Sequence, residues 1–168
     1  MLMHMSNSVP PNRSTPRHSV SVAGVVVRDD GRLLAIRRAD NGTWELPGGV
    51  LELAETPENG VRREVLEETG IHVEVDHLTG VYKNTTAGVV ALVFRCKASG
   101  GTERLSRETT AVQWLTPEEV VDRMSEVYAV RLLDALDGNG PHVRSHDGRH
   151  LLRDQPKTAA GRRDERSA

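Results

Sequence analysis

The sequence of 168 residues contains few of the residues that mark several large classes of protein. Cys96 is the one cysteine, which excludes an intrachain disulfide and is typical of a reducing compartment, so we expect a cytoplasmic protein. Aromatic residues make up only 3% of the chain, and the 22 Lys and Arg residues do not outnumber the 24 Asp and Glu residues. Both facts argue against a nucleic-acid polymer as partner, because such binding uses stacking platforms and an excess of basic charge. No run approaches the ~20 apolar residues of a membrane span, and residues 1–18 lack the apolar stretch of a secretory signal, so no membrane partner is expected.

Composition divides the chain into three parts. Residues 1–17 mix Pro, Ser, Asn and Arg without periodicity, which predicts a disordered lead. Residues 18–137 alternate between strand and helix patterns and are predicted to form one domain. Residues 138–168 are predicted to form a C-terminal extension, with a small hairpin over 142–152 that turns at Asp147-Gly148 and a disordered tail from 153.

Within the domain, apolar periodicity and turn residues predict an α/β (α+β) fold in the order β-β-β-α-β-β-β-α. A hairpin is expected over 19–38 with its turn at 29–31, and Pro47 with the two following glycines is expected to end any strand. Thr56 as a cap, Pro57 in the first turn and Gly70 as a stop predict a helix over 56–70. Further strands are expected at 72–83, 88–98 and 111–115, before a helical region that runs from 117 to about 137 and restarts at Ser125.

The predicted helix carries three glutamates on one side. At about 100° per residue, Glu67 and Glu68 lie within an arc of roughly 100° around Glu64, and the remaining arc is expected to pack on a sheet through Val61, Val65 and Leu66. Carboxylates this close repel one another, so the face is unfavourable unless a cation occupies it. Mg²⁺ prefers oxygen ligands and shares them with water and substrate phosphates. The alternative is an ordinary solvated acidic face, because glutamate-rich helix surfaces are common.

The residues around these glutamates favour a metal site over a solvated acidic face. The segment from Gly49 to Ile71 reads G-VLELA-E-TPENGVR-RE-V-L-EE-T-G-I, and at every defined position it resembles the Nudix box, G-x5-E-x7-R-E-U-x-E-E-x-G-U, in which U is a bulky aliphatic residue. Seven fixed identities at usual residue frequencies arise by chance on the order of once in 10⁸ start positions. The preceding W-x-L-P-G-G, the later strand ending near Trp114 and the final helix are also similar to Nudix domains, so the resemblance extends over about residues 19–136.

The resemblance implies a Nudix-type α/β/α sandwich with a mixed sheet, whose loop-helix-loop motif holds Mg²⁺, or Mn²⁺ as a substitute, against a substrate pyrophosphate. Glu67 and Glu68 match the main metal ligands of the family. Glu64 matches a residue that serves as a ligand or as the general base, and Gly48 matches the position whose backbone carbonyl joins the ligands. A glycine suits that position because the backbone must approach the ion closely.

The same resemblance assigns supporting roles. Arg63 completes the implied catalytic set and is expected to pair with Glu55, which would orient the glutamates, while Gly49 and Gly70 are expected to be structural. A further metal ligand is expected in the loop before the last strand. Glu108, six residues before Trp114, is the candidate, with Glu103 as the alternative.

Several polar residues outside the motif are less clearly assigned. Four are candidates for contact with the substrate, with a solvated strand end or pocket rim as the alternative: Arg37, Arg38, Lys83 and Asn84. Three histidines recur every four residues, but Pro141 and the turn at 147–148 argue against a helix that would gather them into a metal site, so their role stays open: His142, His146 and His150.

These features predict a Mg²⁺-dependent pyrophosphohydrolase whose partner is a small nucleotide, a nucleoside diphosphate linked to another group, cleaved by water at phosphorus. A canonical or oxidised (d)NTP is favoured, because residues 85–87 lack the proline that is common there in ADP-ribose members of the family. The alternatives are an ADP-ribose or other nucleotide-sugar pyrophosphatase, a non-catalytic Nudix module that binds a nucleotide-like ligand, and a Nudix-fold isomerase of prenyl diphosphates. The resemblance also implies a homodimer.

Overall fold

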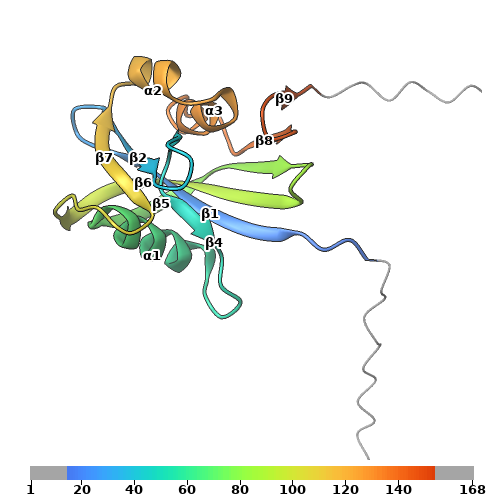
Figure 1. Ribbon diagram of the computed structural model, residues 1–168, viewed down its shortest axis with the longest axis horizontal. Coiled ribbons are helices and arrows are strands. Elements are labelled where there is room, and N and C mark those ends of the chain that lie inside the picture. Colours follow the sequence, from blue (N-terminus) through green and yellow to red (C-terminus); the bar gives the residue numbers. More distant parts are fainter. Residues whose placement is uncertain (1–14, 154–168) are drawn as a thin grey trace, which may run out of the picture.

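The strand β1 (Ser19–Val27) lies in the middle of a mixed sheet, and its sequence explains that position (Figure 1). Its residues are small or β-branched, and Val22, Val25 and Val26 are fully buried, as expected for a strand that is covered on both faces. The computed structural model describes residues 15–153. The elements after β1 are β2 (Leu33–Arg38), β3 (Trp44–Glu45), β4 (Gly48–Val50), α1 (Pro57–Thr69), β5 (Ile71–Asn84), β6 (Val89–Gly101), β7 (Thr109–Leu115), α2 (Pro117–Arg123), α3 (Glu126–Asp134), β8 (His142–His146) and β9 (Leu151–Leu152).

The strands follow the order β3-β2-β1-β6-β5-β8-β9, with β7 paired to β2 and β4 paired to β1. One edge of β1 runs parallel to β6 along its whole length. Two strands share the other edge of β1. Strand β2 pairs with it at Val27 and Leu33, and β4 pairs antiparallel with Ser21–Ala23. The sequence-based expectation that the two glycines after Pro47 end any strand is therefore wrong. Without side chains, Gly48 and Gly49 can lie directly against β1, where a Cβ on Gly48 would overlap Ala23.

Helices cover both faces of the sheet, which confirms the predicted α/β/α sandwich (Figure 1). On one face, Val61 and Val65 of α1 join a buried cluster with Val22 and Val26. On the opposite face, α2 and α3 join a second cluster that contains Val25 and Tyr82. Helix α1 therefore packs on one face of the sheet, and α2 and α3 pack on the other. Both sets of helices contact the same central strand, β1.

The ends of α1 lie where the sequence predicts them. The Thr56 side chain accepts a hydrogen bond from the Asn59 amide at 3.3 Å, and Pro57 follows at the first helical position. Gly70 has a φ of 78°, a left-handed conformation that favours glycine, and its amide donates to the Leu66 carbonyl at 2.9 Å. The helix therefore begins and ends at fixed residues, which sets the rotation of its glutamates relative to the sheet.

The C-terminal part continues the sheet. The predicted helical region is two helices, α2 and α3, and Ser125 is the N-cap of the second. The predicted hairpin is present as β8 and β9, and β8 also pairs in parallel with Gly80–Asn84 of β5. Disorder is predicted for residues 1–17 and 153–168, of which 1–14 and 154–168 lie outside the described residues. Residues 15–17 and 153 are described and belong to no helix or strand. No helix between residues 15 and 153 is long and apolar enough to cross a membrane.

Gly24 tests how closely α1 must approach β1. A Cβ at Gly24 would lie 2.9 Å from Cγ2 of Val65 and 3.2 Å from Cγ1 of Val61, so a larger side chain displaces the helix. We expect Gly24→Val to lower the free energy of unfolding by about 1–3 kcal/mol in urea titrations. Ser19→Val, at an exposed position of the same strand, is the control and should change it little. Equal effects of the two substitutions would contradict this account.

Candidate functional site

Helix α1 and the loop before β7 bring four carboxylates to the same small cavity. The cavity has a volume of about 100 Å³ and is lined by Glu64, Glu67, Glu68, Ser106, Arg107 and Glu108. Glu108 is 40 residues or more from the helix glutamates in sequence, and the Thr109 hydroxyl beside it donates to the Glu68 carbonyl at 3.3 Å, which ties the loop to the helix. Glu103, the alternative ligand, lies elsewhere and accepts a hydrogen bond from Nε1 of Trp114 at 2.5 Å.

The three helix glutamates differ in depth. Glu67 is exposed, with 59% of its side chain accessible, whereas Glu64 and Glu68 are buried. The expectation that the acidic arc and the packing arc are separate is therefore wrong. On the helical wheel Val61 and Val65 lie about 60° and about 100° from Glu64, beside Glu68, and both valines are buried on the same side as the two glutamates. Leu66, expected with them, is only half-buried.

Two glycines of β4, which have no side chains, leave room for the carboxylates on the buried side of α1. A Cβ on Gly49 would lie 2.5 Å from the carboxyl carbon of Glu64, so any side chain there would displace the glutamate. The Gly48 amide donates to Oε2 of Glu68 at 2.8 Å. Since the N–H and C=O of one strand residue point to the same side, the Gly48 carbonyl faces the carboxylates too. Gly48 is thus placed where the resemblance requires a carbonyl ligand.

Burial of these carboxylates changes their acidity. Desolvation raises the pKa of Glu68 to about 8; the Gly48 amide partly opposes this, and the negative charges of Glu64, Glu45 and Glu108 add to it. Desolvation also raises the pKa of Glu64, against the effect of the Arg63 guanidinium. Without further positive charge, burial therefore shifts these two carboxyl groups, Glu64 and Glu68, toward their protonated forms.

Arg63 provides part of that positive charge. Its Nη1 lies 2.7 Å from Oε1 of Glu64 and 3.3 Å from Oε2 of Glu67. On its other side, Nε and Nη2 donate to Glu55 at 3.0 and 2.6 Å, and Nη2 also donates to the Val50 carbonyl at 3.1 Å. This hydrogen-bonded pair lowers the pKa of Glu55 to about 2. The structure thus places Glu55 as the group that holds Arg63 against the glutamates.

The donor set suits a hard divalent cation. Every candidate ligand is an oxygen, and two of the carboxylates are buried with raised pKa values, so a cation would remove an unfavourable interaction. The ligand atoms are not packed into one tight group. In the described chain, a set with atoms within 4.8 Å of one another occurs instead at Asp134, Asp137 and His142. There Asp134 already accepts two hydrogen bonds from Arg144, at 2.7 and 2.6 Å.

The four residues proposed to contact substrate separate into two pairs. Arg38 lines a cavity of about 150 Å³ together with Gly48 and Gly49, and Asn84 lines an adjoining cavity of about 170 Å³. Arg37 donates instead to the Gly42 carbonyl at 3.0 Å, and Lys83 is exposed; neither lines these cavities.

Sequence reasoning missed three residues that line the cavity beside Gly48: Glu45, Tyr128 and Arg131. One signal was available in the sequence, because Arg131 lies four residues after Val127 and next to Leu132, on the apolar face of α3. Of the three periodic histidines, His142 is near Asp137, His146 is buried and His150 is exposed. They do not form a shared set of ligands among the described residues.

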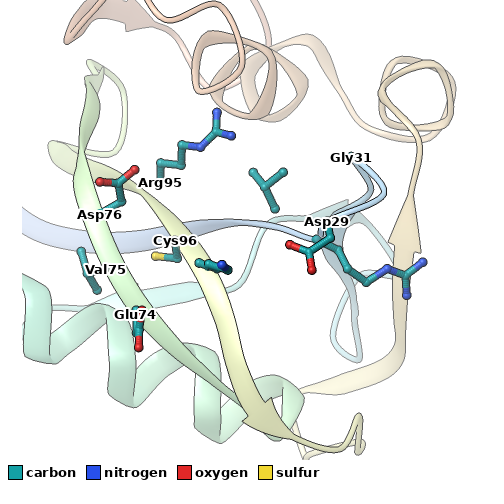
Figure 2. A pocket seen from close by; sticks show the side chains of 10 residues that line it. Asp29, Gly31, Glu74, Val75, Asp76, Arg95 and Cys96 are labelled. Carbon is teal, nitrogen blue, oxygen red and sulfur yellow. The ribbon is translucent and has the colours of Figure 1, made fainter.

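A larger hollow of about 600 Å³ lies apart from the glutamates. It is lined by residues of β1, β5 and β6 and of the turn after β1, and its charged groups have both signs (Figure 2). The labelled side chains include Asp29, Asp76 and Arg95. None of the four carboxylates of the small cavity lines this hollow. Its larger volume is therefore no reason to prefer it as the candidate functional site.

Comparison with known proteins agrees with the geometry. The family model described as "NUDIX domain" matches residues 17–136. A "MutT-like protein" of Streptomyces ambofaciens is 77% identical over 154 residues, which cover 90% of this chain and 98% of that protein. Two more distant relatives cover about half of this chain. An "ADP-ribose pyrophosphatase" of Methanocaldococcus jannaschii is 38% identical over 49% of this chain and 53% of its own length. A "Putative 8-oxo-dGTP diphosphatase" of Bacillus subtilis is 30% identical over 55% of this chain and 63% of its own length.

Solved structures show the same fold. The crystal structure of a Nudix hydrolase from Nitrosomonas europaea matches with a TM-score of 0.68 and 24% sequence identity, over 79% of this chain and 81% of that one. At that identity, the match concerns the architecture alone.

The buried Glu68 carboxyl makes stability depend on pH. Its pKa rises from 4.5 in the unfolded chain to about 8 in the folded protein, so the folded state holds an extra proton between these values. The free energy of unfolding of the metal-free protein should therefore fall as the pH rises from 5 to 8, by at most about 1.4 kcal/mol per pH unit from this group. Thermal unfolding in EDTA measures this slope. Glu68→Gln should flatten it, whereas Glu58→Gln, at an exposed position, should not; a steep slope in Glu68→Gln would contradict the assignment.

Proposed function

The chain belongs to the Nudix family and is a Nudix hydrolase, and from this premise we propose that it is a Mg²⁺-dependent pyrophosphohydrolase that cleaves a nucleoside diphosphate linked to another group. The observation that carries the proposal is the cavity at which two buried glutamates with raised pKa values meet Glu67 and Glu108. Four carboxyl groups at one cavity, two of them buried, are typical of a metal and phosphate site rather than of a solvated helix surface.

The ion-binding residues follow from the cavity. Glu64, Glu67, Glu68 and Glu108 would hold the ion with the Gly48 carbonyl. Mg²⁺ bound there supplies the positive charge that neutralises phosphate oxygens and favours ionisation of water, and Mn²⁺ can substitute. Arg63 is a positioning residue, because its guanidinium is bound to Glu55 and fixes the glutamates rather than facing an open cavity.

Glu64 is proposed as the base for the attacking water. Its Oε1 is bound by Arg63, and burial raises its pKa toward the range in which a carboxylate accepts protons efficiently. The water oxygen forms a bond to phosphorus, its proton passes to the carboxylate, and the bond between phosphorus and the bridging oxygen breaks in line. Both electrons of that bond leave with the departing phosphate group, and no covalent intermediate with the protein is needed.

The preferred substrate is a (d)NTP, either canonical or oxidised, which is cleaved to the monophosphate and pyrophosphate. The cavity beside Gly48 has a volume of about 150 Å³ and the cavity that adjoins it about 170 Å³, and together they reach the lower end of the range for small-molecule sites. The name of the Bacillus subtilis relative agrees with this choice. ADP-ribose or another nucleotide sugar is the second candidate, and the name of the Methanocaldococcus relative favours it. A non-catalytic binding role is disfavoured because every defined carboxylate of the box is present.

Removal of one carboxylate tests the reaction. Glu67→Gln should lower kcat by about a hundredfold with Mg²⁺, since a ligand of the ion is lost while the exposed position tolerates the change. The assay is a panel of (d)NTPs, ADP-ribose and UDP-glucose in ¹⁸O-water, with mass spectrometry of the products. The ¹⁸O should appear in the product that contains the attacked phosphorus. Unchanged activity of Glu67→Gln, or activity of the wild type in EDTA, would contradict the proposal.

Glu108 and Glu103 form a matched pair for the ligand outside the box. Glu108→Gln should reduce kcat about tenfold or more and raise the Mg²⁺ concentration needed for half-maximal rate, because Glu108 lines the cavity of the helix glutamates. Glu103→Gln should leave both values near those of the wild type, since a glutamine oxygen can still accept the Trp114 hydrogen bond. The reverse ranking would move the ligand to Glu103.

A further inference from the structure

Arg131 is buried and forms no ion pair with a carboxylate among residues 15–153, although the negative charge of Glu45 in the same cavity acts to raise its pKa. It is 8% exposed, and its Nε is the one buried side-chain nitrogen or oxygen of residues 15–153 that has no hydrogen-bond partner. Burial lowers the pKa of this guanidinium, which means that the folded protein bears a cost for its charge. A buried arginine is normally paired with a carboxylate, so this arrangement requires an explanation.

The neighbouring histidine satisfies Arg131 only in part. Nη2 of Arg131 lies 3.2 Å from Nε2 of His146, while Nδ1 of His146 accepts a hydrogen bond from the Gly148 amide at 3.1 Å. A neutral imidazole has one acceptor nitrogen, so it cannot accept from both donors at once. Burial and the Arg131 charge lower the pKa of His146, so protonation, which would remove both acceptors, is disfavoured. Arg131 therefore retains unused donors.

Aromatic rings hold the guanidinium in place. Its central carbon lies 5.2 Å from the ring centre of Tyr82 and 5.1 Å from that of Tyr128. These contacts favour the cation but offer no hydrogen-bond acceptor in the plane of the guanidinium. The two rings thus hold the guanidinium in one orientation while its Nε–H has no hydrogen-bond partner. Such a preorganised, unpaired donor is expected where a ligand binds.

The free donors border the proposed nucleotide site. Arg131 lines both cavities next to the box, and one of them also contains Glu45, Gly48 and Gly49. Glu45 is 7% exposed, and its Oε1 accepts a hydrogen bond from Nη1 of Arg38 at 3.1 Å. The same cavity therefore has a buried guanidinium with an unpaired Nε–H and a buried carboxylate acceptor, close to the backbone that binds Glu68.

We propose that Arg131 and Glu45 select guanine, in its unoxidised form, as the base of the substrate. This inference rests on the proposed function and names the base for the same site. Arginine donates to two adjacent acceptors, and the O6 and N7 atoms of guanine are such a pair. A carboxylate accepts from N1–H and the 2-amino group on the neighbouring edge. Adenine has an amino donor where guanine has O6, and 8-oxoguanine has a hydrogen on N7, so each would meet Arg131 with a donor.

Binding of nucleoside monophosphates tests the base without requiring hydrolysis. Calorimetric titration with Mg²⁺ present compares dGMP with dAMP, with 7-deaza-dGMP, which lacks the N7 acceptor, and with 8-oxo-dGMP. The wild type should bind dGMP about tenfold or more tightly than each of the others, the size expected of one bidentate contact. Arg131→Met should bring dGMP and 7-deaza-dGMP to equal affinity. Glu45→Gln should narrow the preference for dGMP over dAMP.

Controls separate a loss of recognition from a loss of fold. Arg123→Gln removes an exposed arginine of α2 outside both cavities and should keep the wild-type ranking. Arg131→Met should have a Tm no lower than that of the wild type, because it removes a buried charge without a carboxylate partner. If this variant does not fold, the 7-deaza-dGMP comparison in the wild type still decides the question.

The possible failures are distinguishable. Absence of dGMP binding, equal binding of dGMP and dAMP, tighter binding of 8-oxo-dGMP, or an equal loss for all bases in Arg131→Met would each overturn the role of Arg131. A wild-type preference for dGMP without Mg²⁺-dependent hydrolysis of any nucleotide would overturn the proposed function and leave the base assignment intact.

Discussion

The close approach of α1 to bare backbone is the constraint on which the rest of the site depends. Val61 and Val65 pack against Gly24, and the Glu64 carboxyl occupies the space that a side chain at Gly49 would fill. This contact buries Glu64 and Glu68 along with the valines. Ordinary amphipathic packing would leave the glutamates in water, where their repulsion is weak. Because Glu64 and Glu68 are buried, their ionised forms are destabilised when the helix packs on the sheet. Their pKa values therefore depend on nearby positive charge.

The charges on the two sides of the sheet are unbalanced in opposite senses. Four carboxylates meet at the α1 side, where Arg63 donates to two of them, Glu64 and Glu67, and also to Glu55. On the α3 side, Arg131 is buried against two tyrosine rings and forms no ion pair among the described residues, although Glu45 lines the same cavity. In a ligand with a divalent cation on its phosphates, the cation would neutralise the carboxylates. Acceptor atoms on the base of the same ligand would accept hydrogen bonds from Arg131. Binding of a metal-nucleotide complex would therefore remove an electrostatic cost of the folded protein, which would link affinity to catalysis.

Local sequence predicted the parts of the site that local interactions determine. The ends of α1 follow from Thr56 and Gly70, and the membership of Glu67 and Glu68 in one acidic group follows from helical spacing. The depth of Glu64 and Glu68 did not follow, because it depends on a strand, β4, whose formation requires contact with β1 rather than strand propensity. Arg131 and Glu45 are 86 residues apart and meet only through the sheet, so no spacing rule indicates that they share a cavity. Pairing of β8 with β5 is equally non-local, and it brings His146 to Arg131.

If separate elements hold the phosphates and the base, related proteins can differ in substrate, as the names of two relatives do. In the proposed function, the box, β4 and the loop before β7 would supply the charged groups around phosphorus. The two residues proposed to face the base, Glu45 and Arg131, come from β3 and α3, neither of which belongs to the box. A change of residue at Arg131 or Glu45 alters hydrogen-bond complementarity without moving α1, since α1 lies on the opposite face of the sheet. Substrate choice can therefore vary while the reaction stays the same, because separate parts of the fold determine them.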